Sequence, residues 1–314
     1  MALDHVNVYV IDEGDSWTII DTGFWSKKTQ SIWSDIKEKW FSDKPIGKVI
    51  VTHHHPDHVG LAGWFQTEFK ADLWMSRTAW LMARMLRLDY QKLPTEETIN
   101  FWRRAGMDDL ILNERATGKP FNFGDSVHEM PLGFRRIIDG EKIILGNRSW
   151  IVRVGNGHAP EHLTLWCEDD PIVIAGDQII SSISPNLGVY ATEPEADPVQ
   201  EWLMSCEAFL PFSNDKQLVL PGHKLPFYGL PHRLKQLIEN HHSALKRLVA
   251  FLKEPQTAVD CFPVLFNRKI SDNEYGLALV EAVAHLNHLY RKKIVKRELN
   301  SKGAYVYTLK FDKK

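Results

Sequence analysis

Residues 48–58 have the sequence Lys-Val-Ile-Val-Thr-His-His-His-Pro-Asp-His. The short apolar run at 48–51 predicts a buried strand, and ligand-binding residues of α/β folds collect at the carboxyl ends of such strands. His53 and His55 are two positions apart on an extended turn, so their side chains should point the same way. Asp57 and His58 follow directly and can serve an adjacent ion. The stretch therefore predicts a metal-binding loop at the end of a strand.

The distribution of the other histidines supports this prediction. Seven of the 14 histidines fall in three short windows, at residues 53–58, 158–162 and 223, and each window follows a predicted strand. Neutral imidazole and carboxylate groups hold zinc, iron or manganese, and a site for two ions needs roughly six or seven of them from different loops. Histidines scattered over a surface would not cluster in this way.

The pattern of apolar residues predicts a layered α/β fold. A hairpin is expected over 6–21, a helix over 26–41, a second helix over 60–69 and a helix over 197–210, with strands at 48–51, 134–174 and 217–220. Residues 77–131 are rich in aromatic residues and arginine and predict a helical insertion that can act as a lid. We expect a catalytic domain over 1–235 and a small second domain over 236–314.

The C-terminal part of the chain differs in charge from the rest. Residues 240–314 contain 14 Lys and Arg against 7 Asp and Glu, a net charge of +7, which leaves −9 for the first 239 residues because the total is −2. Helices are expected over 241–252, 257–265 and 276–290, followed by a hairpin of strands 294–298 and 305–309. Three helices and a two-stranded wing are the pattern of a winged-helix domain.

Composition excludes several other classes of protein. With 314 residues, 44% hydrophobic residues and 25% charged residues, the chain is typical of a soluble globular protein. It has no apolar run of the ~18 residues that a membrane span needs and no signal-like start, so we expect a cytoplasmic protein without membrane contact. Three widely spaced cysteines, Cys167, Cys206 and Cys261, do not indicate a disulfide framework or a cysteine zinc site.

Five short motifs together resemble those of the metallo-β-lactamase fold superfamily, in particular its glyoxalase II-like and lactamase-B2-like hydrolases. They are IIDTG with Asp21, THHHPDH at 52–58, GNGHAPEH with His158, IAGD with Asp177 and LPGH with His223. The resemblance covers about residues 1–235, and the basic tail resembles the winged-helix extension of the lactamase-B2-like branch. It implies a four-layer αββα sandwich with the site at the edge between two sheets.

The resemblance also implies two sets of metal ligands. The first ion would be bound by His53, His55 and His158. The second would be bound by Asp57, His58 and His223, and Asp177 would bridge the two. Three further residues would support these ligands without binding metal, namely Asp21, His54 and His162. Two divalent transition metal ions are expected, zinc foremost, although His and Asp sites also accept iron and manganese.

Two adjacent cations lower the pKa of a bridging water toward neutrality, which predicts a hydroxide nucleophile at pH 7. Asp57 and Asp177 are the expected catalytic groups, because they are best placed to hold that hydroxide and to relay its proton. No serine or cysteine nucleophile is then required, and the GxSxG and P-loop signatures are absent.

Departures from relatives argue against β-lactam and lactone substrates, and the expected substrate is an ester or thioester. Common zinc β-lactamases have a cysteine where this chain has Asp177, and lactonases of this fold have a tyrosine where it has Ile180. The segment between Asp177 and His223 is too short for the inserted domain of the RNA-processing β-CASP branch. The insertion supplies candidate contacts to a small-molecule substrate with an apolar acyl or aryl group and an anionic portion, namely Trp80, Met85, Trp102, Arg103 and Arg104.

Two alternatives stay open. The first is a phosphodiesterase or ribonuclease acting on single-stranded RNA, with phosphate contacts from the basic residues at 291–293 and from Lys296 and Arg297. The second is a ligand-sensing protein that binds nucleic acid, although a pure sensor has no need of a complete ligand set. The apolar face of the helix at 276–290 can instead pack on the body or form a homodimer.

Overall fold

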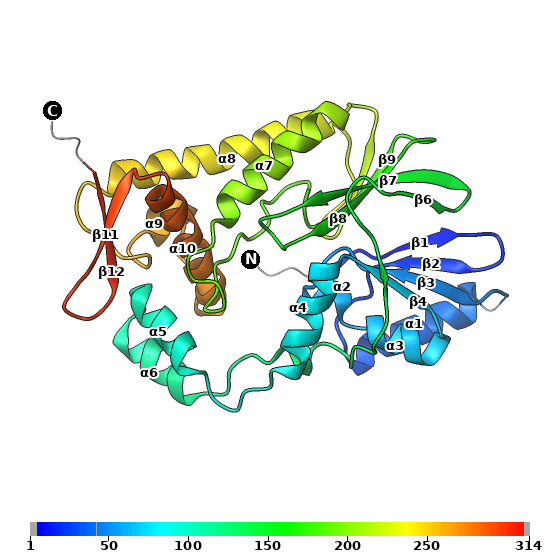
Figure 1. Cartoon of the computed structure of the whole chain (residues 1–314), viewed down its shortest axis with the longest axis horizontal. Coiled ribbons are helices and arrows are strands. Elements are labelled where there is room, and N and C mark those ends of the chain that lie inside the picture. The colour runs from blue at the N-terminus through cyan, green and yellow to red at the C-terminus, as the bar shows by residue number, and fades with distance from the viewer. Residues whose placement is uncertain (1–4, 42, 311–314) are drawn as a thin grey trace.

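The computed structural model describes residues 5–41 and 43–310, in which two five-stranded sheets lie face to face (Figure 1). The first sheet has the order β1-β2-β3-β4-β5. Its strands are β1 (Tyr9–Asp12), β2 (Trp17–Ile20), β3 (Ile46–Ile50), β4 (Asp72–Met75) and β5 (Arg135–Arg136). The second sheet has the order β10-β9-β8-β7-β6. Its strands are β6 (Lys142–Leu145), β7 (Arg148–Gly155), β8 (His162–Cys167), β9 (Ile172–Gly176) and β10 (Leu218–Pro221).

Strand direction places the loops of the site at one edge. In the first sheet β2, β3, β4 and β5 run parallel, and in the second sheet β10 runs parallel to β9. The carboxyl ends of β3, β9 and β10 are followed directly by histidine- and aspartate-containing loops. Because parallel strands end at the same edge of a sheet, these loops can converge.

Adjacent residues in the central strands are buried on opposite faces. In β2, Ile19 packs into the cluster on the helix side of the first sheet, while Ile20 packs into the cluster between the two sheets. Val49 and Ile50 of β3 repeat this arrangement, and Leu165 of β8 contributes to the layer between the sheets. A strand that is buried on both faces needs apolar residues without interruption, which explains the Val-Ile-Val run.

Helices cover the outer faces of both sheets. The first sheet is covered by α1 (Lys27–Trp40) and α3 (Ala62–Phe69), with Trp33 of α1 packed edge-on against Phe65 of α3 at 5.0 Å between ring centroids. The short α2 (Pro56–Val59) begins at the proline of the histidine motif. The outer face of the second sheet packs against α7 (Pro198–Phe209), whose Trp202 is fully buried. The predicted layered fold is thereby confirmed.

The insertion after β4 is helical. It contains α4 (Arg77–Leu88), α5 (Glu96–Arg104), α6 (Asp109–Thr117) and the 3-10 turn η1 (Phe123–Asp125). α4 lies beside the first sheet, whereas α5 and α6 lie next to the C-terminal hairpin (Figure 1). The N-terminus of α4 is fixed by Ser76, which accepts from the Ala79 N–H, and by Glu161, which accepts from the Thr78 N–H.

The C-terminal part has helices and a small sheet, as the sequence predicts. It contains α8 (Leu230–Phe251), α9 (Phe262–Phe266), the 3-10 turn η3 (Asp272–Glu274), α10 (Tyr275–Arg291) and the hairpin β11 (Val295–Leu299) and β12 (Tyr305–Leu309). A further 3-10 turn, η2 (Leu210–Phe212), follows α7. The helix α8 runs without a break through residue 235, so one continuous element joins the two predicted domains. The apolar residues of α7, α8 and α10 share one core.

Two further findings concern membrane spans and cysteines. Within the described ranges, none of the helices combines the length and the apolar character that a bilayer crossing requires. Cys167, Cys206 and Cys261 are free thiols.

A buried histidine pair makes the C-terminal core sensitive to acid. The rings of His241 in α8 and His285 in α10 are stacked with centroids 5.2 Å apart, and His241 Nδ1 lies 3.1 Å from His285 Nε2. Burial lowers the pKa of His241 to about 3 and that of His285 to about 4. Both rings are therefore neutral in the folded chain, while an unfolded histidine is protonated below about pH 6.5.

We expect the free energy of unfolding to fall as the pH drops below about 6.5. In this range the two histidines bind protons in the unfolded chain but stay neutral in the folded chain. Each such proton steepens the dependence by about 1.4 kcal/mol per pH unit. A His241→Leu/His285→Leu variant should lose this part of the slope. Urea denaturation of both proteins between pH 4.5 and 7 measures it, and parallel stability curves would contradict the expectation.

Candidate metal centre

The predicted ligands come from four separate connections that meet at one edge of the sandwich. His53 and His55 lie in the loop after β3, and Asp57 and His58 lie on α2. His158 lies in the turn between β7 and β8, Asp177 lies directly after β9, and His223 lies shortly after β10.

Their ligand atoms form three overlapping groups, in each of which all atoms lie within 4.8 Å of one another. The first group is His53, His55 and His158. The second is His53, His58 and Asp177. The third is Asp57, His58 and His223. The first and third groups have the composition that the resemblance implies for two neighbouring ions.

Three of the histidines are oriented by hydrogen bonds from the ring nitrogen on the far side. Nδ1 of His58 bonds to the Asp21 carboxylate at 2.8 Å, Nδ1 of His158 donates to the Asn186 carbonyl at 2.9 Å, and Nδ1 of His223 donates to the His5 carbonyl at 2.6 Å. A carbonyl only accepts, so Nδ1 of His158 and of His223 carries a proton, and Nε2 of all three rings faces the centre. The facing carboxylates raise the pKa of His58 well above its usual range and that of His223 to about 9 although burial opposes this, so a divalent ion would take the place of a proton on these two Nε2 atoms.

The inward-facing atoms of this set are short of partners. Among the described residues, the buried Nε2 atoms of His58, His158 and His223 have carboxylate oxygens nearby but no partner in hydrogen-bond geometry, and Oδ1 of Asp177 has none either. Buried polar atoms are normally paired because an unpaired one is costly. Converging imidazole lone pairs around carboxylates suit a divalent transition metal ion, so the residues present fit the implied ions.

Asp177 lies at the middle of the cluster. Its Oδ2 is 3.3 Å from His223 Nε2, 3.4 Å from His58 Nε2 and 3.6 Å from His158 Nε2. Burial opposes ionisation, but the charge of His58 and the nearby rings of His158 and His223 hold the pKa of Asp177 well below its usual range. One carboxylate oxygen thus faces histidines of both ligand groups, which is the position a bridging ligand requires.

The remaining ligands are held in ionisation states that suit metal binding. Burial and the neighbouring imidazoles keep the pKa values of His53 and His55 well below the usual range, so both rings are neutral. Asp57 Oδ2 lies 3.1 Å from His223 Nε2. Burial opposes ionisation of this carboxyl as well, yet His58 and His223 lower its pKa.

Asp21 supports the histidine loop from behind. It adopts a left-handed backbone conformation with φ of 61°, and its carboxylate accepts from the Thr52 N–H and hydroxyl as well as from His58. Such a conformation is tolerated by Asp and Asn better than by most residues. The buried carboxylate therefore fixes both the start of the loop and the orientation of one predicted ligand.

The two other predicted supporting histidines are also buried at the cluster. His162 Nε2 accepts from the Asp177 N–H at 3.1 Å, and its ring stacks on that of His53 at 4.5 Å. Burial lowers the pKa of His162 to about 3 and that of His54 to about 4. His162 thus holds the backbone of Asp177, and His54 packs beside the ring of His55.

Sequence reasoning did not single out three groups that orient the ligands. Thr52 bridges Asp21 and His53, with its hydroxyl 3.0 Å from His53 Nδ1. The carbonyls of His5 and Asn186 hold His223 and His158. The position of Thr52 inside the motif was a usable signal, whereas a backbone carbonyl leaves none in the sequence. Gly222 was not singled out either, and it matters for a different reason, since a Cβ atom there would lie 2.2 Å from Asp177 Oδ1 and would block this close approach.

The candidate substrate contacts divide into two sets. Trp80 stacks on Phe134 at 4.7 Å, and Met85 is exposed on the same helix. Trp102, Arg103 and Arg104 lie on α5 near the C-terminal hairpin, where Arg104 donates to the Gly303 carbonyl at 3.0 Å.

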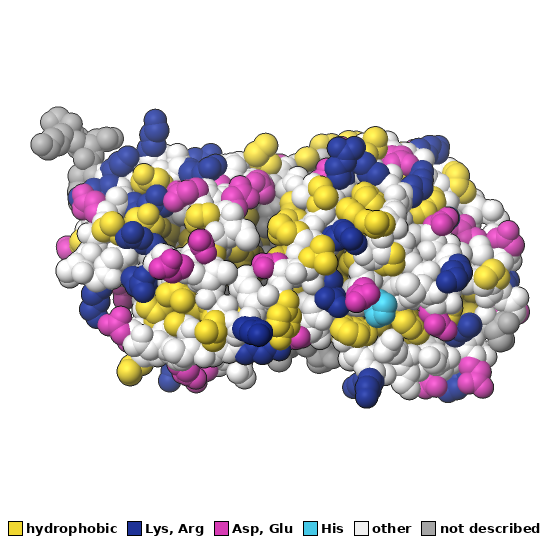
Figure 2. All heavy atoms as spheres, turned by 60° about the horizontal axis from the view of Figure 1, so that its bottom comes forward, with side chains coloured by type: hydrophobic (Ala, Val, Ile, Leu, Met, Phe, Trp, Pro, Cys, Tyr) yellow, Lys and Arg dark blue, Asp and Glu magenta, His cyan; other side chains and the backbone are white. Residues whose placement is uncertain are grey.

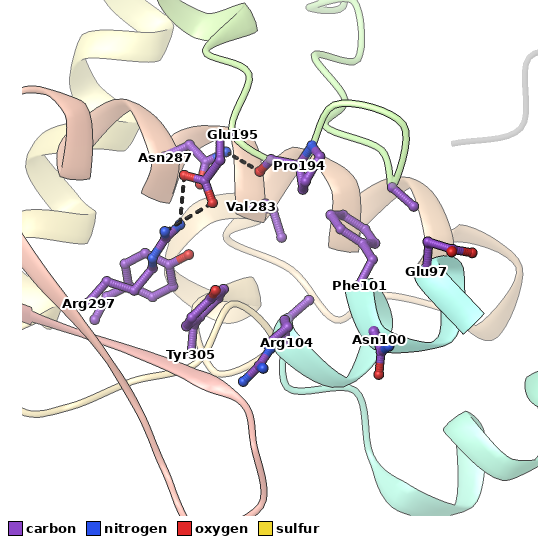
Figure 3. Close-up of a pocket in the computed structure, with 13 residues that line it drawn as sticks. Glu97, Asn100, Phe101, Arg104, Pro194, Glu195, Val283, Asn287, Arg297 and Tyr305 are labelled. Carbon is purple, nitrogen blue, oxygen red and sulfur yellow. Dashed lines mark hydrogen bonds and ion pairs between the residues drawn. The ribbon is translucent and has the colours of Figure 1, made fainter. Parts of the chain in front are cut away.

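Arg104 also lines a cavity of about 260 Å³ between α5, the loop before α7 and the C-terminal hairpin. Figure 3 shows the Arg297–Glu195 ion pair on one side of this cavity and Phe101 on the other. The role of these insertion residues in substrate binding stays a prediction.

A buried His and Asp cluster at the edge of an αββα sandwich defines a class of metal-binding α/β proteins. The chain belongs to the metallo-beta-lactamase superfamily, whose family model matches residues 1–223. A second model, described as the metallo-beta-lactamase-like C-terminal domain, matches residues 245–310.

Known proteins resemble the chain over nearly its whole length. A beta-lactamase domain protein from Burkholderia ambifaria is 31% identical, with a TM-score of 0.89 over 99% of this chain and 90% of that one. The metallo-beta-lactamase family protein TTHA1429 from Thermus thermophilus is 25% identical, with a TM-score of 0.74 over 97% of this chain and 94% of that one. The probable metallo-hydrolase YqjP of Bacillus subtilis (strain 168) is 23% identical over 98% of this chain and 95% of its own length.

Proposed function

We propose that the chain is a hydrolase that binds two divalent metal ions, zinc foremost, and cleaves an ester or thioester. The observation that carries the proposal is the convergence of seven ligand residues in two groups around Asp177. His53, His55 and His158 would hold the first ion, Asp57, His58 and His223 would hold the second, and Asp177 would be the ligand that the two share.

Two divalent ions bound there would lower the pKa of a water molecule and polarise a substrate carbonyl or phosphoryl oxygen. The chain supplies the rest. Asp57 and Asp177 both keep a lowered pKa and each places Oδ2 beside His223 Nε2. These ionised oxygens can accept hydrogen bonds from the attacking water, orient it and relay its proton to the leaving group.

The buried thiols do not offer a competing nucleophile. Cys206 and Cys261 are buried, and burial raises the pKa of both thiols, that of Cys261 to about 12. Because the thiolate is the reactive form, neither residue suits covalent catalysis. Activated water is the nucleophile that the buried carboxylates and imidazoles support.

An acyl substrate is favoured over RNA because basic residues that could contact phosphates are already paired with acidic side chains. Arg297 forms a two-point ion pair with Glu195, and Lys296 pairs with Glu298. On the face drawn in Figure 2, acidic and basic side chains of the described residues are intermingled and do not gather into one basic surface. Nucleic-acid binding depends on such a surface because it neutralises several phosphates at once.

The finer assignments belong to the same proposal. The C-terminal helices and hairpin are assigned as a winged-helix extension, and the chain is placed in the glyoxalase II-like or lactamase-B2-like part of the superfamily. Its free thiols support a cytoplasmic location, since secreted proteins tend to form disulfides. A homodimer through the C-terminal part is a further proposal that size measurement in solution tests.

A rate comparison tests the substrate class. Acyl thioesters, aryl esters and single-stranded RNA are each incubated with the metal-loaded protein at fixed salt, and with the Asp177→Ala variant as the control. We expect thioester or ester turnover that disappears in the variant. Cleavage of RNA alone, also lost in the variant, would replace the acyl substrate with a phosphodiester.

A further inference from the structure

The loop after β9 brings the C-terminal part of the chain to the metal centre. Residues 177–197 connect β9 to α7, and the Asn186 carbonyl within this loop accepts the hydrogen bond of His158 Nδ1 at 2.9 Å. The beginning of the loop is fastened to α8, because Arg233 donates to the carbonyls of Ile180 and Ile183, both at 2.7 Å. One predicted metal ligand is thus oriented by a loop whose own position is set by the C-terminal helices.

Helix α10 fixes the same loop at Asn186. Asn186 Nδ2 donates to Glu281 Oε2 at 2.7 Å and to the Leu277 carbonyl at 3.2 Å, and the Val189 N–H donates to the Val280 carbonyl at 3.1 Å. Leu187, between these anchors, is completely buried in the core that α10 shares. Three polar contacts and one apolar contact therefore dock this short segment onto a single helix.

Burial disfavours the ionised form of the Glu281 carboxyl. Burial raises its pKa to about 7, and the hydrogen bond from Asn186 only partly offsets this rise. A hydrogen bond to an ionised carboxylate is roughly twice as strong as one between neutral groups. The bond to Glu281, at 2.7 Å, is also the shorter of the two that the Asn186 side chain makes, since the one to the Leu277 carbonyl is 3.2 Å.

We propose that Asn186 and Glu281 are positioning residues of the metal centre, through which α10 holds the ring of His158. The inference rests on the proposed function, because it takes His158 as a metal ligand. Partners of the outer ring nitrogen fix the tautomer and direction of a ligating histidine, and their loss typically costs about 10- to 100-fold in metal affinity. Glu281 contacts the side chain of Asn186 and not His158 itself. Its loss would therefore let the Asn186 carbonyl move and the His158 ring turn.

The test measures metal binding by the full-length protein, without use of its activity. Metal-free wild type, Glu281→Ala, Glu281→Gln and Asn186→Ala are titrated with Zn²⁺ against a chelator that competes for it. We expect Glu281→Ala and Asn186→Ala to weaken one of two binding steps about tenfold and to leave the other unchanged. Glu281→Gln, which keeps an accepting oxygen, should recover most of the affinity.

A matched variant controls for general effects on the helix. Leu277→Ala changes an exposed side chain of α10 but keeps the carbonyl that Asn186 uses, so it should bind Zn²⁺ as wild type does. The double variant Asn186→Ala/Glu281→Ala should bind Zn²⁺ no more weakly than Asn186→Ala does. The reason is that each change removes the same Asn186–Glu281 hydrogen bond. Visible spectra of the Co²⁺-loaded proteins should differ from wild type in the two single variants that weaken binding.

The outcomes separate this inference from the proposed function. Two binding steps in wild type with unchanged affinity in Glu281→Ala would overturn the positioning role alone. A wild-type protein that binds no Zn²⁺ would overturn the proposed function together with it. If Glu281→Gln were as weak as Glu281→Ala, the accepting oxygen would not be what matters, which also contradicts the proposal.

Discussion

Replacing Asp177 with alanine should reduce hydrolysis by about 10³-fold or more, which corresponds to about 4 kcal/mol in the barrier. Oδ2 of this residue lies within 3.6 Å of Nε2 of three histidines, of which His158 belongs to the first ligand group and His58 and His223 to the second. Without it the two groups lose their shared carboxylate, and the buried imidazoles face one another with less compensating charge. Metal content per chain and kcat/KM, measured on the same preparation, check both consequences.

The control for this variant is Asp170→Ala, which removes an exposed carboxylate from the turn between β8 and β9. Asp170 pairs with Arg148 at the surface, so its loss should change neither metal content nor kcat/KM appreciably. An Asp177→Ala protein with full metal content and full activity would rule out the bridging role.

The second large effect is expected from Asp21→Asn. Asparagine tolerates the left-handed backbone of this position and can still accept from Thr52 with its amide oxygen. Its NH₂ group, however, would face His58 Nδ1, which now bonds to a carboxylate oxygen at 2.8 Å. The ring would then shift its proton to Nε2, and the nitrogen that should bind metal would lose its lone pair.

We expect Zn²⁺ affinity in Asp21→Asn to fall about 10- to 100-fold while the protein stays folded. Competition with a chelator measures the affinity, and urea denaturation shows whether the fold is kept. Asp15→Asn, in the exposed turn between β1 and β2, is the matched control for loss of one carboxylate. Unchanged affinity in Asp21→Asn would mean that His58 does not need this partner.

Much of the fold and the cluster could be predicted because the signals are local. The apolar run before His53 indicates a strand that is buried on both faces, and the structure has such a strand in β3. The spacing of the histidines and aspartates along the chain places each after a strand, and strand ends meet at one edge. Asp21 is brought to His58 by the neighbouring strands β2 and β3.

The parts that could not be predicted depend on contacts between distant segments. Asn186 reaches His158 through its backbone carbonyl and reaches α10 through its side chain, and residues 186 and 281 are far apart in sequence. The helices of the insertion also pack on different parts of the molecule, since α4 lies near the first sheet while Arg104 of α5 bonds to the C-terminal hairpin. Local periodicity predicts that such helices exist but does not predict which surface they pack against.

The central claim is that the seven converging side chains hold two metal ions that make hydrolysis possible. The most direct measurement titrates metal-free, full-length protein with Zn²⁺ and records ions bound per chain together with the rate on an aryl ester or acyl thioester. The proposed function predicts about two ions per chain and activity that returns as they bind. A protein that binds no metal, or that hydrolyses its substrate equally well without metal, would contradict it.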